Sequence, residues 1–254
     1  MPHFVSNGHR IHYREQGTGP LLLILPGNTA SSACHLGELA YFAARCHTVA
    51  VDFWSTGLSD RLDLWPDDWF ERGAQDVLNL IAHLDEDPAI VMGTSGGAWV
   101  ALWMGVFDAS SADRRLVRAI VADSTIAYYP PASLRAEMQA RQARTPDQIA
   151  FWKAAQGDNW AQVVDADSDM LLRQAERGGR IAPERLDTIS CPVLLTATLD
   201  DGLLHEPARQ LPEMAEQIPD ARVYLVKGGG HPLMWSRPEI FRGIVDLFLQ
   251  EIDA

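Results

Sequence analysis

Short apolar runs recur along the chain and predict strands that are buried on both faces, as in a parallel sheet. Residues 3–15 instead alternate in polarity around Asn7-Gly8, which is typical of a hairpin of two antiparallel strands. The pattern therefore predicts eight strands, two of them in the opening hairpin. The six apolar runs cover residues 21–25, 47–51, 89–92, 118–122, 192–197 and 221–226.

Segments with helical spacing of apolar residues separate these runs, most clearly at residues 67–84 and 237–252. The first of them begins with acidic residues, which favour a helix N-terminus. Strands that alternate with helices predict an α/β fold, in which helices flank both faces of a mostly parallel, eight-stranded sheet.

Residues 126–187 break this alternation. They contain helical stretches at 133–144 and 146–156 but no convincing strand pattern. Because the region starts after one sheet strand and ends before another, we interpret it as a helical cap insertion over one end of the sheet. The core is then formed by residues 1–125 and 188–254.

Charge limits the partners of the chain. Its 254 residues include 34 acidic and 21 basic ones, for a formal net charge of −13. That charge would repel phosphate backbones and anionic lipid surfaces. We therefore expect no nucleic acid and no membrane partner, but a small-molecule substrate.

Cysteine usage and the start of the chain bear on compartment and cofactors. Cys34, Cys46 and Cys191 lack CxxC spacing, so neither a disulfide framework nor a thiolate metal site is predicted. The first residues lack the basic and apolar segments of a signal peptide. We expect a cytoplasmic protein, monomeric or homodimeric, that needs no metal and no organic cofactor.

A G-x-S-x-G pattern, Gly93-Thr94-Ser95-Gly96-Gly97, lies between the apolar run 89–92 and a predicted helix over residues 98–106. In this context the pattern is typical of a nucleophile elbow, where a strained turn exposes a serine beside a helix N-terminus. The alternative is a glycine-rich helix start, since short motifs also match by chance. Ser95 is our candidate nucleophile.

A serine hydroxyl needs a base, and the base needs a carboxylate that orients it. His231 follows the last apolar run in a glycine-rich loop, and Asp201 follows the preceding one, in the order Ser…Asp…His. We prefer Asp201 as the acid. Asp200, its neighbour, and Asp123, at the end of an earlier run, remain alternatives.

The oxyanion that forms during attack requires backbone N–H donors. Gly96, directly after the nucleophile, and Asn28, in the loop after the first buried strand, are our candidates. Trp152 and Trp160 in the cap and Trp235 beyond His231 are candidates for substrate binding. The cap aromatics would alternatively form the small core of the cap itself.

Several motifs together resemble the α/β-hydrolase fold enzymes over nearly the whole chain outside the cap. Within that superfamily the chain looks most like the valacyclovir hydrolase-type branch of carboxylesterases, whose spacing from Pro192 also supports Asp201. That branch carries an acidic residue for amine binding where this chain has Gly96. The motifs are Leu25-Pro26-Gly27-Asn28, the segment 52–60, Gly93-Thr94-Ser95-Gly96-Gly97, Asp201 and Gly230-His231-Pro232.

The resemblance and the Ser95, Asp201 and His231 order lead to one functional prediction. We expect a serine hydrolase that cleaves small carboxylic esters through an acyl-enzyme intermediate. One alternative uses the same triad for hydrolysis of a C–C bond, a lactone or an amide. Another is a ligand-binding protein that turns over slowly.

Overall fold

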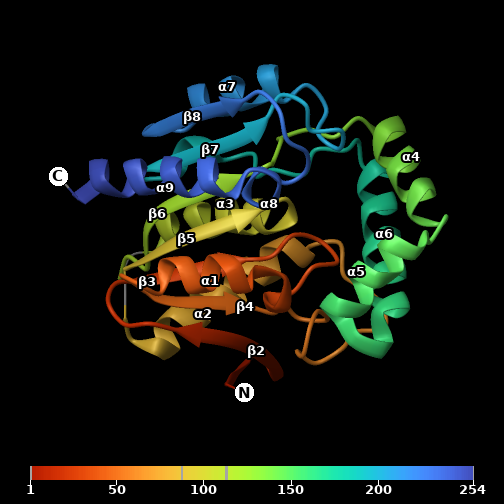
Figure 1. The fold of residues 1–254 in the computed structure, drawn as a ribbon, viewed down its shortest axis with the longest axis horizontal. Coiled ribbons are helices and arrows are strands. Elements are labelled where there is room, and N and C mark those ends of the chain that lie inside the picture. Colours follow the sequence, from red (N-terminus) through yellow and green to blue (C-terminus); the bar gives the residue numbers. More distant parts are fainter. Residues whose placement is uncertain (1, 87, 112–113, 254) are drawn as a thin grey trace.

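The computed structural model describes residues 2–86, 88–111 and 114–253, and its centre is one eight-stranded sheet (Figure 1). The strand order is β1-β2-β4-β3-β5-β6-β7-β8. Strand β2 is antiparallel to both of its neighbours, β1 and β4, and all other neighbouring strands are parallel. This architecture confirms the predicted mostly parallel α/β sheet. The strands are β1 (His3–Ser6), β2 (His9–Gln16), β3 (Leu21–Leu25), β4 (His47–Val51), β5 (Ala89–Thr94), β6 (Val117–Asp123), β7 (Val193–Thr198) and β8 (Ala221–Val226).

Helices cover both faces of the sheet because neighbouring residues of each strand point to opposite faces. In β3, Leu21, Leu23 and Leu25 belong to the core on the α2 and α3 face. Leu22 and Ile24 belong to the core on the α1 and α9 face. One face carries α2 (Trp69–Leu84), α3 (Gly96–Ser110) and α7 (Pro207–Gln217), and the other α1 (Leu36–Phe42), α8 (Leu233–Ser236) and α9 (Pro238–Asp253).

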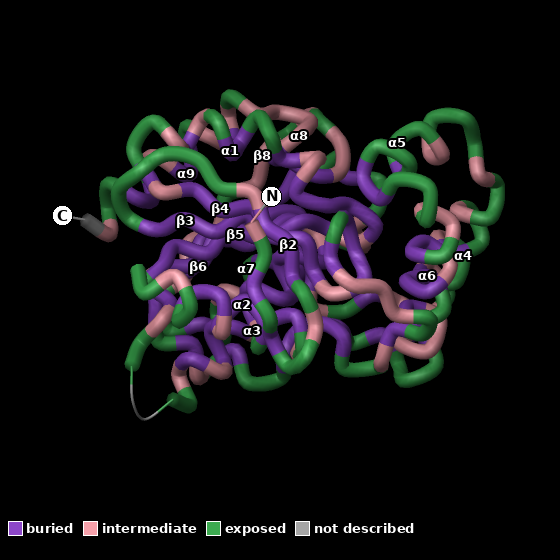
Figure 2. The backbone as a smooth tube through the Cα atoms, turned by 90° about the horizontal axis from the view of Figure 1, so that it is seen from below, coloured by how far each residue is buried: buried purple, intermediate pink, exposed green. Residues whose placement is uncertain are grey.

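Three helices between β6 and β7 stand apart from these layers. They lie beyond the carboxyl ends of the parallel strands, at the right of Figure 1. Their outer turns are exposed, whereas the strands of the sheet are mostly buried (Figure 2). We call α4, α5 and α6 the cap helices; they span α4 (Pro131–Arg141), α5 (Pro146–Gln156) and α6 (Trp160–Glu176).

The observed boundaries differ from the predicted ones by a few residues at helix ends. The predicted helix at 98–106 begins at Gly96 and continues to Ser110 as α3. The predicted helix at 133–144 is α4, which begins at Pro131, where proline is well tolerated in the first turn, and ends at Arg141. The predicted helix at 146–156 matches α5.

No helix in the described ranges is both long and apolar enough to cross a membrane. Nor do three or more His, Cys, Asp or Glu side chains come together there in a way that could hold a metal ion.

Candidate active site

Ser95 occupies a sharp turn between β5 and α3. Its backbone has φ 53° and ψ −121°, a conformation that costs energy for a residue with a side chain. The flanking glycines allow the turn to close, since a Cβ on Gly93 would lie 2.1 Å from the Gly97 carbonyl oxygen. A Cβ on Gly97 would lie 2.2 Å from the Leu25 carbonyl oxygen. This geometry is that of a nucleophile elbow and not of an ordinary helix start.

His231 and Asp201 come together from two different loops. The Nδ1 atom of His231 lies 2.8 Å from Oδ2 of Asp201. The other carboxylate oxygen accepts backbone N–H groups of Leu203 at 2.9 Å and Leu204 at 3.3 Å. The Asp201 side chain is fully buried, while 15% of the His231 side chain is exposed. The buried Asp201 carboxylate therefore fixes the orientation of the His231 ring through its Nδ1 atom.

The two alternative acids have other partners. Asp200 is exposed, and its Oδ2 accepts the Gly228 N–H at 2.7 Å, so it braces the loop that carries His231. Asp123 is completely buried and accepts the hydroxyls of Thr94 at 2.9 Å and Thr196 at 2.8 Å. Burial raises the pKa of Asp123 to about 6. Both carboxylates are thus engaged in hydrogen bonds that hold neighbouring segments.

Ser95 and His231 line two adjoining pockets beneath the cap helices. The inner pocket, about 50 Å³, has an apolar wall that includes Trp99, Leu134 and Met138. The outer pocket, about 200 Å³, is lined by residues of α5 and of the loops at the carboxyl ends of the strands. A nucleophile candidate and a histidine therefore share a small, mostly apolar enclosure.

The three predicted substrate-binding tryptophans have different positions. Trp152 and Trp235 line the outer pocket. Trp160 is not among the described residues on the wall of either pocket; it stacks on Trp152, with ring centroids 5.6 Å apart and planes 12° apart. An aromatic pair of this kind buries one ring behind the other. Trp160 therefore packs against a residue of the outer pocket wall, and its role in substrate binding stays a prediction.

The predicted oxyanion donors are neighbours in space. Asn28 lies in the loop after β3 and lines both pockets. A Cβ built on Gly96 would lie 3.2 Å from the backbone nitrogen of Asn28. In the same loop, a Cβ on Gly27 would lie 3.0 Å from Cβ of Ser95. The backbones of this loop and of the elbow thus approach each other directly beside Ser95.

Charged residues of the cap, which were not predicted from the sequence, also reach the site. Glu137 and Arg141, one turn apart on α4, line both pockets. Asp167, on α6, pairs with Arg141 and accepts a hydrogen bond from the side chain of Asn28. The i, i+4 spacing of Glu137 and Arg141, on the face that carries Leu134 and Met138, was the available signal.

A family model described as "Alpha/beta hydrolase family" matches residues 22–243 of the chain. The chain belongs to the alpha/beta hydrolase family. The match includes the elbow, the cap helices and the loop of His231.

Named relatives of this alpha/beta hydrolase are hydrolases. A 2-(acetamidomethylene)succinate hydrolase of Mesorhizobium japonicum is 28% identical and aligns with 94% of this chain and 92% of its own. A putative carbamate hydrolase of Azorhizobium caulinodans is 28% identical with both chains fully covered. The crystal structure of an E-2-(acetamidomethylene)succinate hydrolase has the same fold, with a TM-score of 0.73, 22% identity and 96% of each chain covered.

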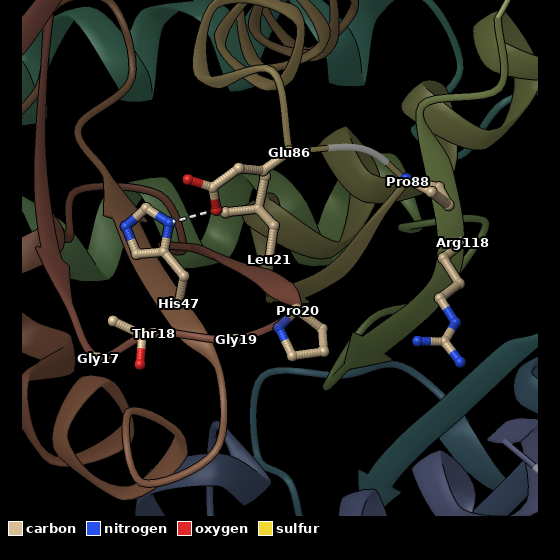
Figure 3. A pocket seen from close by; sticks show the side chains of 9 residues that line it. All are labelled: Gly17, Thr18, Gly19, Pro20, Leu21, His47, Glu86, Pro88 and Arg118. Atoms are coloured by element: carbon tan, nitrogen blue, oxygen red, sulfur yellow. Dashed lines mark hydrogen bonds and ion pairs between the residues drawn. The ribbon is translucent and has the colours of Figure 1, made fainter.

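A larger hollow of this hydrolase, about 740 Å³, lies at the opposite end of the sheet, where β3 and β4 begin. Figure 3 shows the residues that line it. Its wall includes the first residues of β3 and β4, Leu21 and His47, and Arg118 near the start of β6. His47 contacts Glu86 at 2.7 Å. The described lining of this hollow contains neither serine nor cysteine.

Proposed function

We propose that this protein is a serine hydrolase that cleaves small carboxylic esters through an acyl-enzyme intermediate. One observation carries the proposal: Ser95, at a strained elbow, shares its pockets with His231, whose Nδ1 lies 2.8 Å from the buried carboxylate of Asp201. This arrangement supports a catalytic triad, which is recognised on unrelated folds by geometry and by the roles of its residues.

In the proposed mechanism, Oγ of Ser95 attacks the ester carbonyl carbon while Nε2 of His231 takes the hydroxyl proton. Asp201 keeps the other ring nitrogen protonated and favours the charged ring that forms. The backbone N–H groups of Gly96 and Asn28 stabilise the oxyanion. His231 then gives the proton to the leaving alcohol, and finally takes a proton from the water that releases the acid.

The size and lining of the pockets support a small substrate. Their volumes are about 50 Å³ and about 200 Å³, and aromatic rings of Phe151, Trp152 and Trp235 border the larger one. Glu137 and Arg141 add one acidic and one basic group, with Nε and Oε1 3.9 Å apart. Enclosures of this kind bind an apolar body and orient it through a few polar contacts.

Amide or carbamate hydrolysis is the second candidate. One full-length relative is named for a substrate with an acetamido group, and the other is named as a putative carbamate hydrolase. The same triad would act, with a nitrogen leaving group that His231 protonates. Hydrolysis of a lactone or a C–C bond would also use the same site.

The test pairs a substrate panel with active-site labelling. Purified protein is assayed on p-nitrophenyl acetate and butyrate, the matching anilides and a p-nitrophenyl carbamate, and intact mass spectrometry follows labelling by a fluorophosphonate. We expect one label, lost in Ser95→Ala, and the fastest turnover on an ester.

Ser110→Ala is the matched control, since Ser110 lies at the far end of the same helix and donates to the Val106 carbonyl. Faster cleavage of anilide or carbamate would favour the second candidate. Labelling of Ser95 without turnover on the whole panel would indicate a ligand-binding protein, and full activity of Ser95→Ala would refute the assignment.

A further inference from the structure

Asp167 on cap helix α6 is a completely buried carboxylate that joins two separate parts of the molecule. Its Oδ2 accepts a hydrogen bond from the Arg141 guanidinium on α4. Its Oδ1 accepts one from the side-chain amide of Asn28, in the loop after β3. The carboxylate therefore links α4 and α6, two of the three cap helices, to the loop that carries a proposed oxyanion donor.

Burying a charge is costly unless it is paired and hydrogen-bonded. Burial raises the pKa of Asp167, while the charge and the hydrogen bond of Arg141 and the hydrogen bond of Asn28 act in the opposite direction. The Arg141 side chain is itself largely buried, with 16% exposed. Such a pair is weak evidence for stability, because an apolar replacement often serves equally well. The position of the Arg141–Asp167 pair beside the loop of Asn28 indicates a role in the site instead of a role in stability.

The side chain of Asn28 is held at one end only. Its Nδ2 donates to Asp167, whereas its Oδ1 is buried and has no hydrogen-bond partner among the described residues. This Oδ1 lies over Gly96, since a Cβ on Gly96 would be 1.6 Å from it. The contact with Asp167 is thus the polar interaction that sets where the Asn28 side chain lies against the elbow.

We propose that Asp167 is a positioning residue for the oxyanion hole: it docks the cap onto Asn28 and thereby holds the Asn28 backbone N–H toward the oxyanion formed at Ser95. This inference rests on the proposed serine hydrolase function. It adds a dependence of the oxyanion hole on the cap, through the Arg141, Asp167 and Asn28 chain of contacts.

The test uses Asp167→Asn, which replaces one of the two acceptor oxygens by an NH₂ donor, so that Arg141 and Asn28 no longer each face an acceptor. Asp165→Asn is the matched control, because Asp165 lies on the same helix and its Oδ1 contacts Arg144 at 2.5 Å on the partly exposed side. Two inhibitors of equal ring size separate the roles. Phenylboronic acid forms a tetrahedral anion on the serine, whereas benzamide binds as a planar, neutral molecule.

We expect Asp167→Asn to weaken inhibition by phenylboronic acid and to lower kcat by about 10- to 100-fold, the scale of a misplaced catalytic group. Inhibition by benzamide should stay within about 2-fold, and Asp165→Asn should change neither value by more than about 2-fold. Equal loss for both inhibitors, or loss for neither, would show that Asp167 acts on the cap alone and would overturn the proposal.

Asn28→Ala provides a second variant, since it keeps the backbone N–H and removes the side chain that Asp167 holds. We expect it to weaken the boronic acid by about 10-fold or more, and the double variant to be within about 3-fold of Asp167→Asn, because the two residues act through one contact. If Asp167→Asn does not fold, unchanged boronic acid affinity in Asn28→Ala overturns the proposal by itself. A wild-type protein that no fluorophosphonate labels at Ser95 would instead refute the underlying hydrolase function.

Discussion

Two histidines of this protein make the same contact with an aspartate. Nδ1 of His231 lies 2.8 Å from Asp201, and Nδ1 of His12, on β2, lies 2.8 Å from Asp52. Both carboxylates are buried, with 0% and 2% of the side chain exposed. Judged by this contact alone, the two pairs are equivalent.

The surroundings of the His231–Asp201 and His12–Asp52 pairs differ. His12 has 6% of its side chain exposed and lines neither pocket at Ser95. Burial alone raises the pKa of Asp52, but hydrogen bonds from His12 and from backbone N–H groups, including those of Leu58 and Ser32, bring it below its usual value. The pair of His12 and Asp52 therefore connects β2 to the segments of Ser32 and Leu58. His231, in contrast, faces a pocket together with Ser95. A His–Asp pair is catalytic only where its second ring nitrogen meets a nucleophile.

The largest expected effect is that of His231→Ala. Loss of the proposed general base should lower kcat/KM on the best ester by about 10⁴-fold or more, and fluorophosphonate labelling of Ser95 should slow by a similar factor. Steady-state kinetics and labelling time courses measure both. The comparison would be reversed if His12→Ala, and not His231→Ala, removed turnover from folded protein.

Asp201→Asn should have the next largest effect. An amide at this position favours the wrong ring tautomer, so kcat should fall by about 10³- to 10⁴-fold. Asp200→Asn is the neighbouring control: its oxygen can still accept the Gly228 N–H, and kcat should stay within about 3-fold of wild type. Equal losses in the two variants would remove the distinction between these carboxylates.

His12→Ala should affect stability and leave the chemistry intact. The buried Asp52 carboxylate loses one of its hydrogen bonds, which costs about 1–3 kcal/mol of the free energy of unfolding. Urea unfolding at neutral pH measures this loss, and kcat per folded molecule should remain within about 3-fold of wild type. A variant as stable as wild type would show that the pair does not hold the loops.

His35, a third buried histidine, sharpens the comparison because no hydrogen bond to either ring nitrogen exists among the described residues. Burial lowers its pKa to about 4, although the charge of Asp52 acts in the opposite direction. Between about pH 6.5 and pH 4 the unfolded chain therefore binds a proton that the folded chain does not. Stability should fall as the pH falls through this window, by about 3 kcal/mol in total for this group.

His35→Phe removes that titration while keeping a ring against Trp235, whose centroid lies 5.2 Å from that of His35. The difference in unfolding free energy between wild type and variant should be constant above pH 7. As the pH falls from 7 to 4, the wild type should lose stability relative to the variant. Asp123, whose pKa burial raises to about 6, acts with the opposite sign, but it is present in both proteins and cancels. A difference that does not vary with pH would contradict the prediction.

Much of the fold was predictable because its signals are local. Continuous apolar runs identified the parallel strands, and residues 21–25, 47–51 and 221–226 match β3, β4 and β8. Helix ends were less accurate, as at α4, because capping and packing decide the last turn. The serine between strand and helix was also visible, since glycines are needed where two backbones approach closely.

Residues of the site that depend on packing between distant segments were not predictable in the same way. Trp160 stacks behind Trp152, which follows from how α5 and α6 meet and not from the aromatic character of either residue. Asp167 had no local signal, because its partners Asn28 and Arg141 lie 139 and 26 residues away along the chain.

By itself, the sequence determined the order of strands and helices, the elbow at Ser95 and a short list of acids and histidines, because each depends on the period of apolar positions or on a few adjacent residues. Only the tertiary structure decided which of these meet. It brought His231 to Asp201 and not to Asp200, and it enclosed His12 with Asp52 away from the pockets. The physical reason is that hydrogen bonding and burial act over a few ångströms in space, whatever the separation along the chain.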